Sequence, residues 1–150
     1  MRAVFGGQPA LVDLATVTAR LPPRTPAEPF VLSGDPEPFA LAAEAALIAA
    51  IDALAPPAAA VLVPHVSRLG TARRLSAHAG LPVFTGGFTA HGNLGAASLL
   101  VALHRLRREG LRSTGAVAEH VVLASAGGGL SFGAALWRLA PADSGASSGD

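Results

Sequence analysis

The 150-residue chain is predicted to fold as a single α/β domain. Two observations predict this class. Short apolar runs bounded by turn residues alternate with longer segments whose apolar residues recur at helical spacing. The last two apolar runs are joined only by the glycines at 127–129, which allows two strands to pair antiparallel. The expected order is β-α-β-α-β-α-β-β, in a mixed five-stranded sheet with helices against it.

The N-terminal part is predicted to contain one strand and one long helix. Apolar and polar residues alternate over residues 10–20, as in a half-buried strand. Residues 21–38 are proline-rich and are expected to form a loop. A helix is then expected to begin at Pro36, with Asp35 or Ser33 as its N-cap, and to run to about Leu54. Two consecutive prolines stop it there.

The middle of the chain is predicted to alternate strands and helices. Residues 58–64 form a short apolar run, which is typical of a strand buried on both faces. Residues 67–79 are expected to form a helix, and 82–85 a short strand. Residues 86–92 are predicted to be a glycine-rich loop. A third helix is expected over 94–109, with leucines along one side.

Two strands are predicted near the C-terminus. They cover residues 119–126 and 130–139, with the glycine turn between them. Residues 141–150 are rich in Ser, Gly and Asp, and we expect them to be disordered. The predicted domain therefore covers residues 1–140.

The charged fraction is unusually low. Apolar residues make up 51% of the chain and charged residues 14%, against about 25% charged residues in typical soluble domains. One interpretation is that another chain covers part of the surface, since large apolar patches usually mark interfaces. The other is an alanine-rich composition inherited from a GC-rich genome. The chain's eleven basic residues are all arginine, which fits that second interpretation.

Charge and cysteine content exclude several functions. The net charge of +1 argues against nucleic acid or an acidic membrane surface as a partner. The basic cluster is placed at a predicted helix end, where cations complement the helix dipole. Its members are Arg105, Arg107, Arg108 and Arg112. The chain has no cysteine, so it forms no disulfide and supplies no thiolate.

Targeting and metal signals are weak in this sequence. The chain does not begin with a charged leader followed by an apolar core, and its apolar stretches are too short to span a membrane. We therefore expect a cytoplasmic protein without a membrane partner. The spacing of the five histidines resembles no metal motif, and no metal site is expected.

Three positions could carry chemistry. His65 directly follows a predicted buried strand, and ligands of open α/β sheets bind beyond the carboxyl ends of the strands. Asn93 lies between two glycines before a helix, and Gly128 could let a backbone N–H approach an oxyanion. Each position alone also has a structural interpretation: a histidine at a strand end, an N-cap, and a tight turn.

The amino-acid sequences of these three segments, taken in their order, are more specific than any single position. Residues 62–65 read LVPH, residues 92–98 GNLGAAS, and residues 127–136 GGGLSFGAAL. Together they resemble the C-terminal half of ketoacyl-ACP synthase III, a family of the thiolase superfamily, over about residues 30–139. The resemblance implies one half of a thiolase-like fold. It also implies that His65 and Asn93 correspond to the His and Asn of the family's Cys-His-Asn triad, and Gly128 to its oxyanion-hole glycine.

The resemblance further implies acyl transfer or decarboxylative Claisen condensation of thioesters. The acyl groups would be carried on CoA or on the phosphopantetheine of an acyl carrier protein, with no other cofactor. His65 and Asn93 would donate hydrogen bonds to a thioester carbonyl, or His65 would act as a base on an incoming hydroxyl or amine.

The sequence departs from the family's pattern at three points. Arg68 stands where the family usually has Asn, and Ala126 stands where an aromatic residue is common. We interpret Arg68 as a salt-bridge or interface residue, with contact to a phosphopantetheine phosphate as the alternative. The third departure is the absence of the family's N-terminal half with its nucleophilic Cys.

We therefore expect a subunit of a split enzyme of fatty acid or polyketide biosynthesis, with a partner chain that supplies the Cys. The alternative is a non-catalytic partner that stabilises or gates a ketosynthase-like subunit, although retention of His65 and Asn93 argues against it. A fragment of a longer enzyme is less favoured, because a plausible domain start follows Met1 directly. A small-molecule binding protein that uses the acyl pocket ranks last.

Overall fold

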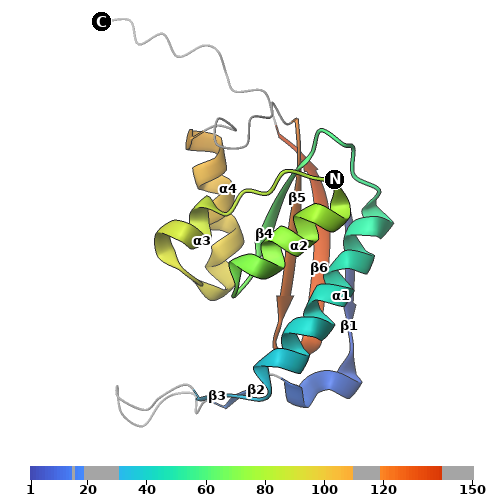
Figure 1. The fold of residues 1–150 in the computed structure, drawn as a ribbon, viewed down its shortest axis with the longest axis vertical. Helices are drawn as coiled ribbons and strands as arrows, with labels where there is room; N and C mark the ends of the chain where they lie inside the picture. Colours follow the sequence, from blue (N-terminus) through green and yellow to red (C-terminus); the bar gives the residue numbers. More distant parts are fainter. Residues whose placement is uncertain (15, 19–30, 110–118, 140–150) are drawn as a thin grey trace, which may run out of the picture.

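The centre of the fold is a mixed sheet of four strands in the order β1-β6-β5-β4 (Figure 1). The computed structural model describes residues 1–14, 16–18, 31–109 and 119–139. β4 and β5 are parallel, whereas β6 runs antiparallel to both of its neighbours. The α/β class with a mixed sheet is confirmed. The strands are β1 (Arg2–Gly7), β4 (Val61–His65), β5 (His120–Gly127) and β6 (Ser131–Arg138).

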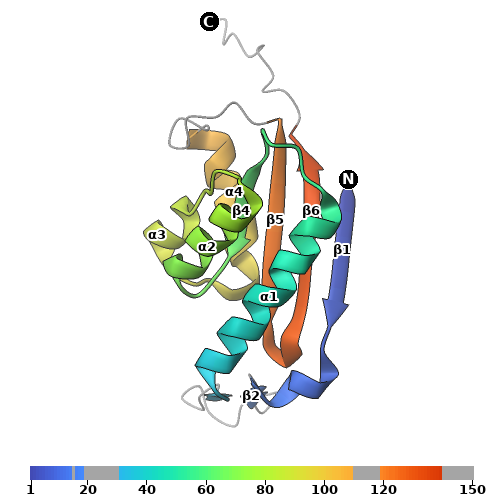
Figure 2. The same ribbon diagram turned by 45° about the vertical axis from the view of Figure 1, so that its right-hand side comes forward.

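Helices lie on both faces of this sheet. α1 (Pro36–Leu54) and α2 (Leu69–Ala79) cross one face (Figure 2). α4 (Ser98–Glu109) packs against β4 from the opposite face, and α3 (Gly86–His91) packs on α4. Each face therefore has its own apolar cluster, one beneath α1 and α2 and one beneath α4. Among the described residues, no helix is long and apolar enough to cross a membrane.

Local signals explain why α1 begins and ends where predicted. The Asp35 carboxylate accepts a hydrogen bond from the Glu37 backbone N–H at 3.2 Å, and Pro36 occupies the first turn. This satisfies one of the unpaired donors at the helix start. The helix ends at Leu54, and Ala55 adopts a left-handed conformation as the C-cap. Asp35 rather than Ser33 is therefore the N-cap.

The prediction of a strand buried on both faces is confirmed for β4. Val61, Leu62 and Val63 have no exposed surface. Leu62 belongs to the cluster beneath α1 and α2, whereas Val61 and Val63 belong to the cluster beneath α4. The predicted strand at 82–85 is reduced to one bridge between Val83 and Leu62 on the outer side of β4. This bridge occupies the fifth position of the expected sheet.

The first strand lies earlier than predicted. Residues 2–7 form β1, at the free edge of the sheet, while Pro9–Leu14 is a 3-10 helix, η1. Among the described residues of the expected strand at 10–20, only Thr16–Thr18 (β2) is extended, and it pairs with β3 (Val31–Ser33) in a region predicted to be loop. β1 was missed because its pairing with β6 is set by contacts across more than a hundred residues, which local alternation does not reveal.

The segment predicted as a glycine-rich loop is the helix α3. Gly87 is buried where α3 meets α4, and a Cβ on Gly87 would lie 3.0 Å from the Ala102 Cα. The glycine thus permits close helix packing and is not a turn residue. The helix expected over 94–109 begins with a 3-10 turn, η2 (Gly95–Ala97), and continues as α4 from Ser98.

The remaining predictions fall mostly at the edges of the described regions. The helix expected at 67–79 is α2, which ends at Gly80 in a left-handed conformation. The last two strands are antiparallel, as predicted, and the glycine turn between them includes the 3-10 turn η4 (Gly128–Leu130). The tail at 141–150 and Arg112 lie outside the described residues.

Candidate active site

His65 ends β4, and its side chain lies on the face of the sheet that α4 partly covers. The parallel register places Ser125 of β5 directly beside it. The His65 Nδ1 atom is 3.0 Å from the Ser125 Oγ atom, and the contact is partly buried. One side of the imidazole ring is therefore held by a residue of the sheet itself.

Asn93 approaches the other side of the ring from the loop between α3 and η2. Its Oδ1 atom is 2.9 Å from His65 Nε2 and also accepts a hydrogen bond from the Gly95 backbone N–H at 2.8 Å. The bond from Gly95 identifies the atom facing the ring as the amide oxygen. His65 Nε2 therefore carries a proton and donates it, since an oxygen acceptor requires a donor. This bond to residue i+2 is an Asx turn, but Asn93 is not the N-cap, because Leu94 precedes the 3-10 helix that starts at Gly95.

The glycine turn lies beside these two residues. Gly128 lines the same groove as His65 and Asn93. Gly129 has a φ of 69°, and the buried Leu130 has a φ of 38°. Left-handed backbone favours glycine, so Gly129 is explained by the tight path of the chain. A non-glycine residue with positive φ is uncommon and costs strain, which here lies next to the candidate site.

A mostly apolar groove of about 690 Å³ leads to His65 and Asn93. One wall comes from Phe39, Ala43 and Leu47 of α1. Val66 and Ala126 add apolar surface near the ends of β4 and β5. Such a groove suits an apolar or slender ligand, and a reactive group on that ligand would meet polar side chains such as His65 and Asn93.

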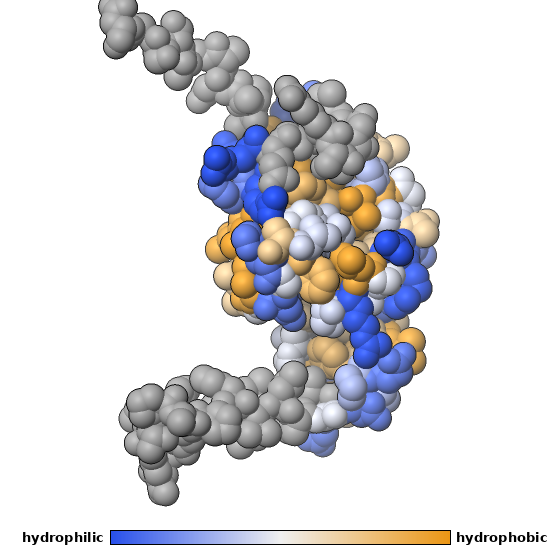
Figure 3. All heavy atoms as spheres, turned by 60° about the vertical axis from the view of Figure 1, so that its left-hand side comes forward, coloured by the Kyte–Doolittle hydropathy of each residue, from blue (hydrophilic) through white to orange (hydrophobic). Residues whose placement is uncertain are grey.

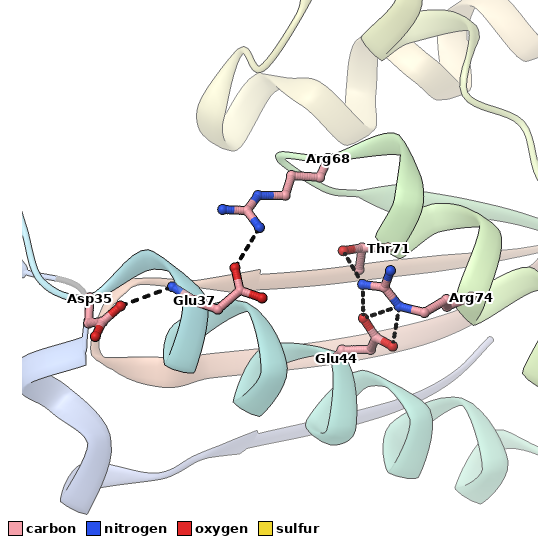
Figure 4. A network of polar contacts seen from close by, with 6 residues as sticks. All are labelled: Asp35, Glu37, Glu44, Arg68, Thr71 and Arg74. Carbon is pink, nitrogen blue, oxygen red and sulfur yellow. Dashed lines mark hydrogen bonds and ion pairs between the residues drawn. The ribbon is translucent and has the colours of Figure 1, made fainter.

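Arg68 lies at this groove and forms an ion pair with Glu37, with 2.8 Å between Nη1 and Oε2 (Figure 4). Both side chains are exposed, by 53% and 64%. This is the kind of contact that the salt-bridge interpretation of Arg68 expects, and a phosphate contact stays a prediction. The ion pair with Glu37 joins the first turn of α1 to the start of α2.

A second ion pair joins α1 and α2 below the first. Arg74 contacts both carboxylate oxygens of Glu44 at 2.6 to 2.9 Å and also reaches Thr71 (Figure 4). The hydrogen bonds and charge of Glu44 raise the pKa of the Arg74 guanidinium above its ordinary value. Glu44 lines the groove, but its carboxylate is engaged by Arg74. It is therefore a structural anion of this wall.

The candidate site is continuous with an exposed part of the sheet. His65, Ser125, Gly133 and Phe5 occupy neighbouring strands and form one row across the sheet. Phe5 is 78% exposed, and Trp137 on the same face is 47% exposed. Figure 3, which views the molecule from another side, also shows hydrophobic patches between hydrophilic residues. The residues that hold His65 thus merge into an apolar surface.

Ser125 is the site residue that the sequence analysis missed. The strand around it was predicted, but the serine was treated only as part of that strand. The available signal was a single hydroxyl in the otherwise apolar second half of β5, two residues before the glycine turn. Its importance depends on the register between β4 and β5, which the sequence does not specify.

The comparisons with known proteins agree with this fold. The family model described as 3-oxoacyl-[acyl-carrier-protein] synthase III C terminal matches residues 50–139. The chain therefore belongs to this family of C-terminal domains. The resemblance noted in the sequence is confirmed. No curated protein matches the chain significantly.

Solved structures of this family share the fold. The 3-oxoacyl-[acyl-carrier-protein] synthase III of Aquifex aeolicus VF5 has a TM-score of 0.72 at 20% identity, over 91% of this chain and 43% of that chain. The Pseudomonas aeruginosa PAO1 enzyme has a TM-score of 0.71 at 23% identity, over 93% and 44%. The Thermus thermophilus enzyme has a TM-score of 0.67 at 25% identity, over 93% of this chain and 46% of that chain. The chain thus spans less than half the length of these relatives.

Proposed function

We propose that this chain is one subunit of a split ketoacyl synthase III-like enzyme, in which it supplies His65 and Asn93. A partner chain supplies the nucleophilic Cys. The observation that carries the proposal is the 2.9 Å contact between His65 Nε2 and Asn93 Oδ1 at the end of an apolar groove. This pair occurs in a chain of the synthase III family that has no cysteine of its own.

The chemistry begins on the partner's thiol. Its sulfur attacks the carbonyl carbon of an acyl thioester, the carrier thiol leaves with a proton, and the acyl group stays on the Cys. In the condensation, a malonyl thioester loses CO₂, and its enolate oxygen accepts hydrogen bonds from the His65 Nε2–H and the Asn93 amide. The enolate carbon then attacks the acyl group and the Cys thiolate leaves. The Gly128 N–H would help to hold the tetrahedral oxyanion.

A second acceptor class fits the same residues. If the acceptor is a hydroxyl or an amine, His65 removes its proton as it attacks the acyl-Cys. The product is then an ester or an amide, and no CO₂ is released. The resting contact of His65 Nε2 with Asn93 Oδ1 favours the condensation, because base catalysis at Nε2 would need the other tautomer.

The exposed sheet surface next to the candidate site supports the need for a partner. The row from His65 to Phe5 continues from the candidate site onto exposed sheet, and residues 93–97 around Asn93 are exposed too. A chain that covered Phe5 would extend along this row toward Ser125 and His65. The low charged fraction of 14% agrees with a surface of this kind.

The substrates would arrive on CoA or on an acyl carrier protein, and no further cofactor is needed. The groove at His65 fits a slender thioester arm. Arg68 could meet a phosphate of such a carrier only by leaving Glu37, so we favour the ion pair as its resting role. One related structure is the priming β-ketosynthase of the R1128 polyketide pathway, which is consistent with fatty acid or polyketide biosynthesis.

The test is reconstitution with a candidate partner that carries the Cys-bearing half. We expect His65→Ala and Asn93→Ala to abolish product formation while the two chains still form a complex. His78→Ala is the matched control, because His78 lies on the α1 side of the sheet and pairs with Asp52. Normal turnover by the His65→Ala complex would contradict the proposal. It would favour the alternative, a non-catalytic subunit that stabilises or gates its partner.

A further inference from the structure

We infer that Ser125 is a positioning residue that holds His65 in the tautomer with its proton on Nε2. The inference rests on the proposed function for its effect on turnover, but its direct test needs neither a partner nor a substrate. Ser125 touches the imidazole at 3.0 Å through Nδ1, on the side of the ring away from Asn93.

The contact is built into the sheet. Ser125 and His65 are registered partners in the parallel pair β5 and β4, so their side chains leave the sheet side by side. On the other side of Ser125 the registered residue is Gly133, which has no side chain. The Ser125 hydroxyl is therefore directed along the row toward His65.

Both ring contacts fit the same tautomer in the resting structure, and the Asn93 contact requires it. Asn93 Oδ1 is fixed by the Gly95 N–H and needs a proton on Nε2. In the neutral ring Nδ1 is then an acceptor, and the Ser125 hydroxyl donates to it. A carboxylate in place of Ser125 would instead demand a proton on Nδ1. A hydroxyl can donate to an unprotonated Nδ1, which a carboxylate cannot, so Ser125 fits a neutral ring protonated on Nε2.

Only the Ser125 contact can persist when a thioester binds. In the proposed reaction, the thioester oxygen accepts the hydrogen bond from Nε2 and replaces Asn93 Oδ1 in that role. Asn93 also lies in an exposed loop, whereas Ser125 is partly buried. If the proton moved to Nδ1, the Nε2 lone pair would face the thioester oxygen and repel it. Ser125 therefore keeps the proton on His65 Nε2 while Nε2 donates its hydrogen bond to the thioester oxygen.

The direct test is the ¹⁵N NMR spectrum of the His65 ring in the full chain labelled on its histidines. We expect a protonated Nε2 and an unprotonated Nδ1 in the wild-type chain. Ser125→Ala should populate the form protonated on Nδ1. Ser125→Thr keeps the hydroxyl and should retain the wild-type pattern. Ser125→Val has the shape of threonine without the hydroxyl and should not. Ser131→Ala is the control, because this exposed serine bonds to Gly128 O and not to His65.

The outcomes separate the inference from the proposed function. The same tautomer in Ser125→Ala, Ser125→Val and wild type would overturn the inference, as would a wild-type ring protonated on Nδ1. In a working pair, Ser125→Ala should lower kcat about tenfold or more, by analogy with other residues that orient a reactive ligand, with KM little changed. Ser125→Thr should recover it. The NMR result stands even if no partner yields turnover, in which case only the proposed function fails.

Discussion

Phe5 of β1 lies over Gly133 of β6, its registered partner on the exposed face of the sheet. In the next pair, on the opposite face, the aromatic residue comes from β6 and the glycine from β1, and Phe132 lies over Gly6. A Cβ on Gly6 would lie 2.5 Å from the Phe132 ring, and one on Gly133 would overlap the Phe5 ring. These two aromatic–glycine pairs anchor the edge strand β1 on β6.

The two glycines are expected to differ in their tolerance of alanine. Phe132 packs against the core cluster beneath α1, so Gly6→Ala forces a packed ring to move and should cost about 1–3 kcal/mol in free energy of unfolding. Phe5 is 78% exposed, and its ring can swing away, so Gly133→Ala should cost less. Gly7→Ala is the control, because its Cβ would meet only Leu130 O at 3.8 Å. Urea denaturation measures all three, and equal costs would contradict this packing.

A second pair of glycine variants should change stability in opposite directions. Gly87→Ala places a Cβ 3.0 Å from the Ala102 backbone, which cannot give way locally, so we expect a loss of about 1–3 kcal/mol. Gly70 is exposed in α2, and its Cβ would meet only the end of the Arg74 side chain at 3.4 Å. Gly70→Ala should therefore stabilise the chain by about 0.5–1 kcal/mol through helix propensity. Thermal unfolding followed by circular dichroism gives both signs.

The two ion pairs between α1 and α2 should differ in importance. Glu44 is only 15% exposed and makes three hydrogen bonds to Arg74, whereas Glu37 is 64% exposed and makes one to Arg68. We expect Glu44→Gln to lower the Tm clearly and Glu37→Gln to leave it nearly unchanged. The pKa of Arg74 is raised by Glu44, so the stabilising contribution of its charge is fully present below the unfolded pKa and is lost only as the pH rises through the folded one. Alkaline titration below pH 11 should therefore not weaken the contact, and calorimetry at pH 7 and pH 10 checks this.

The exposed sheet face should control association. We expect the isolated chain to self-associate in sedimentation, because Phe5 and Trp137 expose apolar surface on the same face of the sheet as Ser125. Trp137→Glu should reduce self-association and weaken binding of a Cys-bearing partner. Leu41→Glu changes a comparable exposed residue of α1 and should do neither. A monodisperse wild-type monomer would argue against an obligate partner.

Local chemistry made parts of this fold predictable. The N-cap Asp35 and the first-turn proline specify the start of α1 within a few residues of sequence. β4 could be predicted from its uninterrupted apolar run. β1 could not, because its stability comes from Phe5 and Gly133, which are far apart in the chain. Gly87 was misinterpreted for the same reason, since its role lies in its distance from Ala102.

The candidate site divides in the same way. His65, Asn93 and Gly128 could be predicted because short motifs around them resemble a known family. The partnership of Ser125 with His65 depends on strand register, which two parallel strands acquire only in the folded sheet. Residues that position a reactive group are therefore harder to predict than the reactive group itself.

The ion pair of Arg68 with Glu37 has a consequence for how ligands reach the groove. Opposite charges 2.8 Å apart largely cancel at a distance, so this pair adds little net field at the groove. The pair would then contribute little electrostatic steering to an anionic carrier. The shape and apolar walls of the groove would then discriminate among carriers after the carrier has met the protein.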